Sequence, residues 1–264
     1  MTDEIVFDHL AVASESALEQ FWRYYGELGG ELAGGGLDPG FWFWQVRYAS
    51  GLKIEILQDD PNQPKEDFLR RFLDRNGAGP HHLTFKVPDV EAIVARADAA
   101  GYQPVGVELE GDWQQAFLHP KQAPGVVIQM AHSNNPPQQY EEHLLPLPKC
   151  RQAADLERVT LMVTDLDREV ALFTGFLAGT ADGSGTDEVG DYTDVMWPNG
   201  GRLRLVVPTD AAASQWLGDR TGRIHHAAFR APDLDTVSNL RPIGEGLYEV
   251  APEHNFGLRL RLRR

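Results

Sequence analysis

Hydrophobic and polar positions near the start of the chain follow one order: a strand, a helix and three further strands. Residues 4–12 are strand-like, and Ser16 and Glu19 stand at the spacing of a capping box, which predicts a helix from Ser16. The apolar side chains that then recur at helical spacing are Leu18, Phe21, Trp22, Tyr25 and Leu28. Gly29 and Gly30 end this helix, because glycine is a common helix stop. Strand-like segments follow at residues 31–33, 41–48 and 52–57. The pattern predicts a β-α-β-β-β module.

The same module is predicted three more times. A short helix at residues 65–75 leads to a second module, which has a strand at 82–87 and a helix that Asp89 caps and Gly101 ends. Its remaining strands are predicted at 102–108, 115–118 and 126–131. The third module is predicted to have strands at 156–163, 191–197 and 202–207 and a helix at 165–177. The fourth is compressed, with strands at 224–230 and 258–262 and a short helix after Asp233.

The modules fall into two pairs. Residues 134–155 are rich in Asn, Pro and Gln, have little apolar periodicity and are interpreted as a linker. We therefore predict an α+β protein with one pair of modules in residues 1–133, the linker 134–155 and a second pair in residues 156–264. Residues 79–89 and 223–233 support duplication, since both contain His-His-x-x-Phe-basic-x-Pro-Asp.

Alternation along four strands places four polar side chains opposite apolar faces. Successive strand side chains point to opposite faces, so Glu55 lies opposite its apolar neighbours, and His82 lies opposite His81. The same reasoning applies to His9 and Gln129 in their strands. His82 follows His9 by 73 residues and Gln129 follows Glu55 by 74, so a pseudo-twofold pairing of two modules would bring all four together.

These four residue types predict a divalent metal site. His and Glu are ordinary ligands of Zn²⁺, Ni²⁺, Co²⁺, Mn²⁺ and Fe²⁺, and Gln can coordinate through its carbonyl oxygen. The predicted ligands are His9, Glu55, His82 and Gln129. His81 shares the apolar face of its strand and is assigned to packing. A single His or Glu in a strand is more often hydrogen-bonded or solvated, and the prediction depends on the shared register of the four.

Composition and charge narrow the class of protein. The chain has 264 residues, of which 42% are hydrophobic and 24% charged, as in a soluble globular protein. Its net charge of −15 disfavours nucleic acid and an anionic membrane as partners, since both attract clustered Lys and Arg. Cys150 is the one cysteine, so no intrachain disulfide can form. An acidic N-terminus without an apolar signal core, and no apolar run of membrane-spanning length, predict a cytoplasmic protein.

The predicted ligands and their flanking residues resemble the vicinal oxygen chelate superfamily, which includes glyoxalase I, methylmalonyl-CoA epimerase, extradiol dioxygenases and bleomycin-resistance proteins. The segments that carry the resemblance are residues 7–12, 51–56, 79–85 and 117–129. The last two look most like the epimerase and glyoxalase branch. The resemblance implies four modules paired into two incomplete barrels. It also implies a divalent metal at His9, Glu55, His82 and Gln129 that stabilises an enolate or related oxyanion of the substrate.

Gln129 departs from the pattern of the epimerases, which typically carry a metal-binding Glu at this position that can also transfer a proton. Glu55 is then the remaining carboxylate at the predicted site and the predicted catalytic residue. An amide cannot serve as a base, so the resemblance favours a one-base isomerase or lyase over a two-base epimerase.

The second pair of modules has different residues at the four ligand positions. Matching the modules by sequence places there Arg158, Leu205, His226 and Arg261. A cationic set without a carboxylate should not bind a divalent metal. The second pair is therefore predicted to be a degenerate, non-catalytic copy.

Further residues are weaker predictions for substrate binding. They are Trp42, Trp44, Arg47, Trp113, His119 and Lys121. The tryptophans could wall an apolar pocket, and the cations could receive a carboxylate or phosphate. Core or interface packing is at least as common for such tryptophans, and surface solvation is the more common fate of such cations.

Three functions fit the sequence. The leading one is a metal-dependent isomerase or lyase of glyoxalase or epimerase type, acting on a small carbonyl-containing substrate. A small-molecule binding protein without turnover, such as one that sequesters an antibiotic, fits the acidic charge and Gln129. An Fe(II) dioxygenase fits the set of two His and one carboxylate. A small molecule is the expected partner in each case, and a homodimer is left open.

Overall fold

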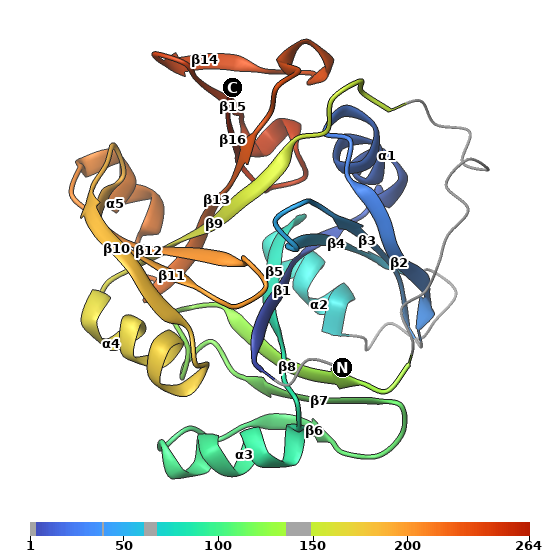
Figure 1. Cartoon of the computed structure of the whole chain (residues 1–264), viewed down its shortest axis with the longest axis vertical. Helices are drawn as coiled ribbons and strands as arrows, with labels where there is room; N and C mark the ends of the chain where they lie inside the picture. The colour runs from blue at the N-terminus through green and yellow to red at the C-terminus, as the bar shows by residue number, and fades with distance from the viewer. Residues whose placement is uncertain (1–3, 39, 61–67, 136–148) are drawn as a thin grey trace. The chain divides into compact units, whose positions relative to one another are not determined.

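The computed structural model describes residues 4–38, 40–60, 68–135 and 149–264, which contain the four modules (Figure 1). Module 1 comprises strand β1 (Val6–Ser14), helix α1 (Ala17–Trp22) with a π-helical turn at Arg23–Glu27, and strands β2 (Glu31–Asp38), β3 (Phe41–Arg47) and β4 (Lys53–Asp59). Helix α2 (Phe68–Asn76) leads to module 2, with β5 (Gly79–Lys86), α3 (Val90–Ala99), β6 (Val105–Glu108), β7 (Trp113–Leu118) and β8 (Val127–Ser133).

The second half repeats this order. Module 3 comprises β9 (Asp155–Val163), α4 (Leu166–Ala171) with a π-helical turn at Leu172–Phe176, β10 (Thr180–Thr186), β11 (Gly190–Met196) and β12 (Arg202–Pro208). Helix α5 (Ala211–Leu217) leads to module 4, with β13 (Gly222–Arg230), a 3₁₀ turn at Leu234–Thr236, β14 (Arg241–Gly244), β15 (Leu247–Val250), a 3₁₀ turn at Pro252–His254 and β16 (Leu260–Arg263).

The strands form two mixed sheets of eight. Their orders are β2-β3-β4-β1-β5-β8-β7-β6 and β10-β11-β12-β9-β13-β16-β15-β14. In each module the first strand pairs in parallel with the last or lies beside it, while the intervening strands form antiparallel hairpins. The outermost strands of each sheet, β2 and β6 or β10 and β14, do not pair with each other, so neither sheet closes into a complete barrel. The predicted fold class is confirmed. None of the helices in the described part of the chain is long and apolar enough to cross a membrane.

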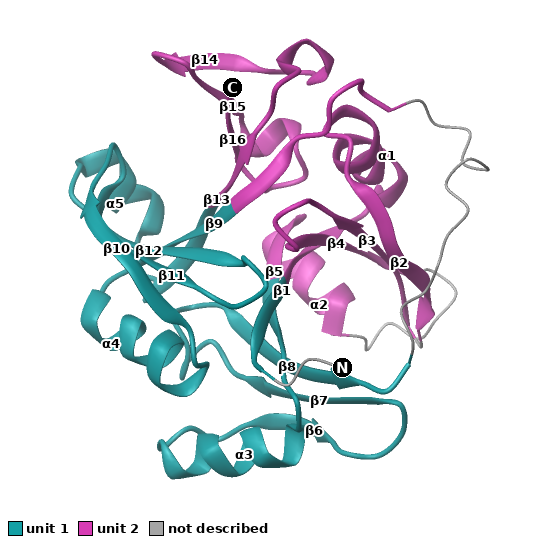
Figure 2. Ribbon diagram, viewed as in Figure 1, with its two compact units in different colours: residues 1–8, 82–136, 158–225 teal, residues 9–81, 137–157, 226–264 magenta. Residues whose placement is uncertain are grey.

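The chain divides into two compact units that combine modules from both halves of the sequence (Figure 2). Unit 1 comprises residues 1–8, 82–136 and 158–225, which are mainly modules 2 and 3. Unit 2 comprises residues 9–81, 137–157 and 226–264, which are mainly modules 1 and 4. The division of the sequence into residues 1–133 and 156–264 stays a prediction. Most of the predicted linker lies in residues 136–148, outside the described residues.

Two of the predicted helix starts use aspartate caps, and one prediction was wrong. Asp89 accepts a hydrogen bond from the backbone N–H of Ala92, which satisfies a free donor at the start of α3. Asp165 caps α4 in the same way. Ser16 makes no side-chain cap, so the predicted capping box does not form. Instead, the Ala17 N–H donates to Oε1 of Gln58 on β4, at 3.0 Å.

A π-helical turn follows the first helix, and one predicted side chain lies on the other face. Leu18, predicted on the apolar face, is 71% exposed, whereas Tyr24 is fully buried. Most of the buried side chains keep the helical spacing of three and four, so Leu18 lies one position away from the buried face; they are Ala17, Gln20, Phe21, Tyr24, Tyr25 and Leu28. The second π turn, at residues 172–176, follows α4 at the matching place of module 3. The sequence patterns also missed β10, β14, β15 and α5, and the predicted helix at 65–75 is observed as α2 at residues 68–76.

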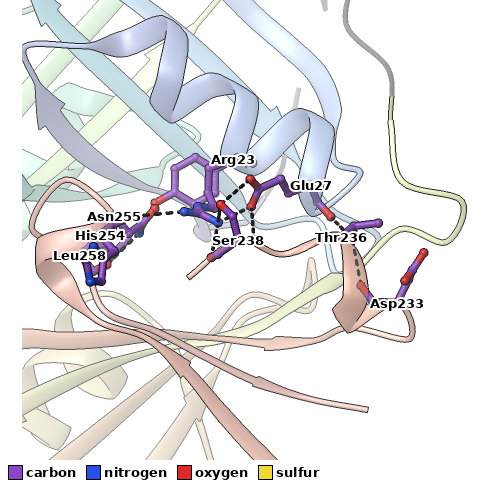
Figure 3. A network of polar contacts seen from close by, with 9 residues as sticks. Arg23, Glu27, Asp233, Thr236, Ser238, His254, Asn255 and Leu258 are labelled. Atoms are coloured by element: carbon purple, nitrogen blue, oxygen red, sulfur yellow. Dashed lines mark hydrogen bonds and ion pairs between the residues drawn. The ribbon is translucent and has the colours of Figure 1, made fainter. Parts of the chain in front are cut away.

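Within unit 2, a polar network joins the first helix to module 4, whose own helix is reduced to residues 234–236 (Figure 3). The buried guanidinium of Arg23 bonds the Glu27 carboxylate, the carbonyl and hydroxyl oxygens of Ser238, and the carbonyl of His254. Glu27 in turn accepts from the N–H and hydroxyl of Ser238, at 3.1 and 2.8 Å. Asn255 donates to the hydroxyl of Tyr24 at 3.1 Å. Side chains of the π turn thus hold the segments that replace the missing helix.

Glu169 of α4 is an ionisable group buried in unit 1. It is 2% exposed, and its Oε2 has no hydrogen-bond partner among the described residues. Burial raises the pKa of Glu169 to about 7, although Arg168 opposes the shift and Asp165 adds to it. Arg168 Nε lies 3.6 Å from Glu169 Oε1. The unit therefore contains a carboxyl that holds its proton close to neutral pH.

We expect this carboxyl to make stability fall as pH rises. Its pKa is about 7 in the folded chain against an ordinary value of 4.5, so the stabilisation is complete below pH ~4.5 and is lost as pH rises through ~7. Glu169→Gln should therefore stabilise the protein at pH 8 by on the order of 2 kcal/mol and change it little at pH 5. Urea unfolding at both pH values measures this. An equal effect of the substitution at pH 5 and pH 8 would refute the assignment.

Candidate metal centre

His9 and Glu55 lie together within unit 2 because β1 and β4 pair in parallel. Ala11 is the register partner of Glu55, and His9 stands two residues before Ala11 on the same face. Nε2 of His9 lies 3.2 Å from Oε2 of Glu55. Both side chains are buried, at 1% and 8% exposure. The contact between these two predicted ligands follows directly from the strand register.

The other carboxylate oxygen of Glu55 is bound by Gln45, a residue that the sequence patterns missed. Gln45 stands directly opposite Glu55 on the antiparallel strand β3. Its Nε2 donates to Oε1 of Glu55 at 2.7 Å. Glu55 therefore presents Oε2 toward His9 and Oε1 toward Gln45.

His82 completes a group of three with metal-ligand spacing. One ligand atom each from His9, Glu55 and His82 lies within 4.8 Å of the others, and all three residues are buried. His82 begins the part of β5 that belongs to unit 1, next to His81 in the chain. Two imidazoles and one carboxylate suit the coordination chemistry of Zn²⁺, Fe²⁺ and similar ions, so the donor set fits a divalent metal.

His81 has the environment of a packing residue. Its ring lies 5.4 Å from that of Phe68 and 4.7 Å from that of Phe72, both on α2. Burial lowers the pKa of His81 to about 4, and the charge of Glu55 opposes this shift. The imidazole is neutral at physiological pH and packs edge-on or tilted against these two rings, as the sequence interpretation assigned it.

Gln129 is buried in unit 1, with both ends of its amide hydrogen-bonded. It is the register partner of Thr84, two residues after His82, so it shares the face of His82 in the paired strands β5 and β8. The Thr84 hydroxyl donates to Oε1 of Gln129 at 2.7 Å. Nε2 of Gln129 donates to Oε1 of Gln115 at 2.8 Å. A carbonyl oxygen has two lone pairs, so Oε1 keeps one that can bind a metal. The role of Gln129 as a ligand stays a prediction.

Helix α2 covers part of the face that carries Glu55. Leu69 and Leu73 of the helix pack with Ala13 and Leu57, which follow Ala11 and Glu55 by two residues on that face. Partly buried aromatic side chains add to this cluster; they are Phe41, Phe43 and Phe72. An apolar layer beside the carboxylate lowers the local dielectric and strengthens its electrostatic interactions.

Asp38, at the end of β2, is a second carboxyl near Glu55 that the sequence patterns missed. Its register partner Phe41 pairs in turn with Asp59 of β4, which lies on the Glu55 face. Burial, and then the charge of Glu55, raise the pKa of Asp38. No sequence signal marks this residue, because an aspartate before Gly40 also fits an ordinary turn.

The residues predicted to bind substrate in module 1 lie in different places. Trp44 pairs with Ile56 and Trp42 with Gln58, so both tryptophans are on the face opposite Glu55. Their rings stack with centroids 6.2 Å apart, and Trp42 is 38% exposed. Arg47 is on the Glu55 side of β3 but is exposed and paired with Glu31 at 2.9 Å.

In module 2, Trp113 shares a face with Gln129. Trp113 and Gln115 lie on one side of β7, opposite residues 133 and 131 of β8, and the Trp113 indole donates to Oε1 of Gln115 at 3.0 Å. Lys86 Nζ lies 3.7 Å from the centroid of the Trp113 ring. The exposed His119 and Lys121 form a turn after β7, in which the Lys121 N–H donates to Nδ1 of His119. Trp113 is thus connected to Gln129 through Gln115.

The strand register corrects one predicted position in the second sheet. Arg204 pairs with Thr160, two residues after Arg158, as Glu55 pairs with Ala11, two residues after His9. Arg204, and not the predicted Leu205, therefore corresponds to Glu55. Its guanidinium binds both carboxylate oxygens of Asp194 at 2.8 Å. A further bond of 2.7 Å joins it to Asp187.

The second sheet has no equivalent metal-binding group in the described residues. Arg261 pairs with Ala228, two residues after His226, which is the relation of Gln129 to His82. Arg259 and Arg261 lie 3.3 and 3.9 Å from the buried Glu249 carboxylate. Arginine is not a ligand of divalent metals, so the chemistry at these positions differs from that of the first sheet.

Modules of the order β-α-β-β-β, with the helix of module 4 reduced to a 3₁₀ turn, and the match to a glyoxalase-like family model place the chain in the vicinal oxygen chelate superfamily. The model of the glyoxalase-like domain family matches residues 7–177, and the chain belongs to that family. A search of curated proteins finds no match.

Several solved structures are similar to this chain, and the first of those described here supports the fold. A triple mutant of 4-hydroxymandelate synthase from Streptomyces coelicolor is similar over 99% of this chain and 92% of its own, with a TM-score of 0.66 and 14% identity. A methylmalonyl-CoA epimerase from Streptomyces coelicolor covers 49% of this chain and 98% of its own, with a TM-score of 0.43 and 21% identity. A hypothetical protein from Bacillus halodurans C-125 covers 51% of this chain and 99% of its own, with a TM-score of 0.45 and 24% identity.

Proposed function

We propose that the protein is a divalent-metal-dependent isomerase or lyase that acts on a small carbonyl-containing substrate. The observation that carries this proposal is the buried group of His9, Glu55 and His82, with ligand atoms within 4.8 Å of one another. Membership of the glyoxalase-like family supports the same class. Gln129 is proposed as a fourth ligand or as a hydrogen-bonding neighbour of the metal.

The proposed chemistry assigns different tasks to these side chains. A divalent metal held by His9, Glu55 and His82 would supply a Lewis acid for the substrate carbonyl oxygen. Oε2 of Glu55 would be the ligating oxygen, because its Oε1 already accepts from Gln45. The amide of Gln129 cannot accept a proton from the substrate. Glu55 and Asp38 are the carboxyl groups proposed for proton transfer. The raised pKa of Asp38 would let it hold a proton to higher pH than a free aspartate does.

Metal analysis and thermal unfolding test this proposal. We expect about one Zn, Ni, Co, Mn or Fe ion per purified chain, and unfolding at lower temperature after chelation. Returning the metal at about 1,000 times its Kd should restore about 4 kcal/mol. If the purified chain contains no stoichiometric metal and added metal does not change its unfolding, the proposal is refuted.

Solvent deuterium exchange tests the reaction class. A metal-dependent isomerase or lyase should exchange the proton α to a carbonyl in one member of a panel of small 2-oxo acids, hemithioacetals and acyl-CoA thioesters. Acyl-CoA thioesters belong in the panel because the similar Streptomyces coelicolor epimerase was solved with 2-nitronate-propionyl-CoA. Exchange should stop with chelator. Tight ligand binding that survives chelation, without exchange, would instead favour a binding protein without turnover.

A dioxygenase is a second candidate function, favoured by one observation. The three grouped residues are two histidines and one carboxylate, the ligand set of non-haem Fe(II) oxygenases. Oxygen consumption with a catechol or 2-oxo acid, dependent on Fe²⁺ and absent with Zn²⁺, would support this function over the isomerase.

A further inference from the structure

The side chain of Gln45 is fixed on two sides within unit 2. Its Nε2 donates to Glu55 Oε1 at 2.7 Å, from the directly opposite position on β3. On the other side, the strand β2 has a register shift between Leu32 and Gly34. A Cβ on Gly34 would lie 3.3 Å from Oε1 of Gln45, closer than nine in ten real Cβ contacts. The glycine leaves room for the amide to lie against the backbone of β2 while it bonds Glu55.

The second sheet has the same cross-strand arrangement with other residues. Asp194 stands opposite Arg204 on β11 and β12, as Gln45 stands opposite Glu55 on β3 and β4. Here too the residue at the ligand position is bonded by its cross-strand neighbour, through two bonds of 2.8 Å. The two sheets carry oppositely charged side chains at this position, Glu55 and Arg204. In both, the cross-strand neighbour forms a hydrogen bond with that charged group.

We infer that Gln45 is a positioning residue that fixes the coordinating oxygen of Glu55; this inference rests on the proposed metal site. By holding Oε1, the amide turns Oε2 toward His9, which lies 3.2 Å away. The hydrogen bond also restricts rotation of the carboxylate. Oε2 would therefore already be oriented for coordination before a metal binds. Hydrogen-bond partners of ligating carboxylates commonly contribute 10–100-fold to metal affinity.

Cobalt binding to the metal-free full-length chain tests this inference. Gln45→Met keeps the length of the side chain but removes the donor, and we expect a Kd for Co²⁺ that is about 10–100-fold weaker. We also expect a changed visible spectrum per bound cobalt, because a carboxylate free to rotate alters the ligand geometry. Gln114→Met is the matched control, since Gln114 of β7 donates to the carbonyl of the exposed Leu109, and this variant should bind Co²⁺ as the wild type does.

The outcomes separate the two proposals. If the wild type binds Co²⁺, His82→Ala does not, and Gln45→Met matches the wild type in Kd and spectrum, the role of Gln45 is refuted while the metal site stands. If the wild type binds no Co²⁺, or His82→Ala binds equally well, the metal site itself is refuted. Gly34→Ala gives a second test, because it leaves the amide in the chain but crowds it. We expect a weaker Kd with the same direction of spectral change, and a wild-type Kd and spectrum would count against the inference.

Discussion

Replacing His82 by alanine is expected to remove the bound metal almost completely. The substitution takes one of the two imidazoles from the grouped His9, Glu55 and His82, leaving too few ligands for a stable divalent site. We expect the metal content to fall from about one ion per chain to near zero, and the Kd to weaken by at least about 100-fold. Metal analysis after dialysis, and titration of the apo protein, measure these changes.

The duplicated histidine of the second sheet provides the matched control. His226 is the counterpart of His82 by register and is buried to a similar extent. His226→Ala removes the same number of atoms from a buried strand, but the arginine-rich positions around it predict no effect on metal content. Loss of metal in both variants to the same degree would mean that folding, and not coordination, explains the result.

Replacing Arg23 by alanine is expected to cost about 3 kcal/mol of unfolding free energy or more. Arg23 is buried, and its guanidinium holds Glu27, Ser238 and the His254 carbonyl in one network (Figure 3). Without it, the Glu27 carboxylate loses its cation, and three backbone or hydroxyl acceptors lose their donor. Urea unfolding of the full chain measures the change.

An exposed arginine shows what the burial contributes. Arg47 also pairs with a glutamate, but both side chains are at least half exposed, so Arg47→Ala should cost less than about 1 kcal/mol. If Arg23→Ala and Arg47→Ala had equal effects on the unfolding midpoint, the network would not fasten module 4 as inferred.

The ligand positions could be predicted because strands repeat every two residues. Alternation assigned His9, Glu55 and His82 each to the face of its strand opposite the apolar side chains, and the spacing between modules brought them together. The structure groups these three residues. Gln45 and Asp38 could not be found in this way. Their roles depend on which residue of another strand stands opposite, which is set by hairpin length and by the register shift in β2.

The mistaken Leu205 shows how a one-residue error changes a side chain's face. Counting four residues from Gly201, as Glu55 follows Gly51, gives Leu205. The structure shows that Gly200 is the true counterpart of Gly51, since both turn the chain with a positive φ, 86° and 87°. Counting from Gly200 gives Arg204. Two adjacent glycines carry no sequence signal for which one has the left-handed conformation.

The paired π-helical turns also record the history of the chain. They occupy residues 23–27 and 172–176, each directly after the first six-residue helix of its half. Such a turn needs an inserted residue, which destabilises a helix unless its surroundings adapt. Its presence at the same place in both halves indicates one insertion, already present in the ancestral half before duplication. The ligand positions, by contrast, now hold His9 and Glu55 in one copy and Arg158 and Arg204 in the other. The two halves therefore share this backbone irregularity, although they differ in the residues at the ligand positions.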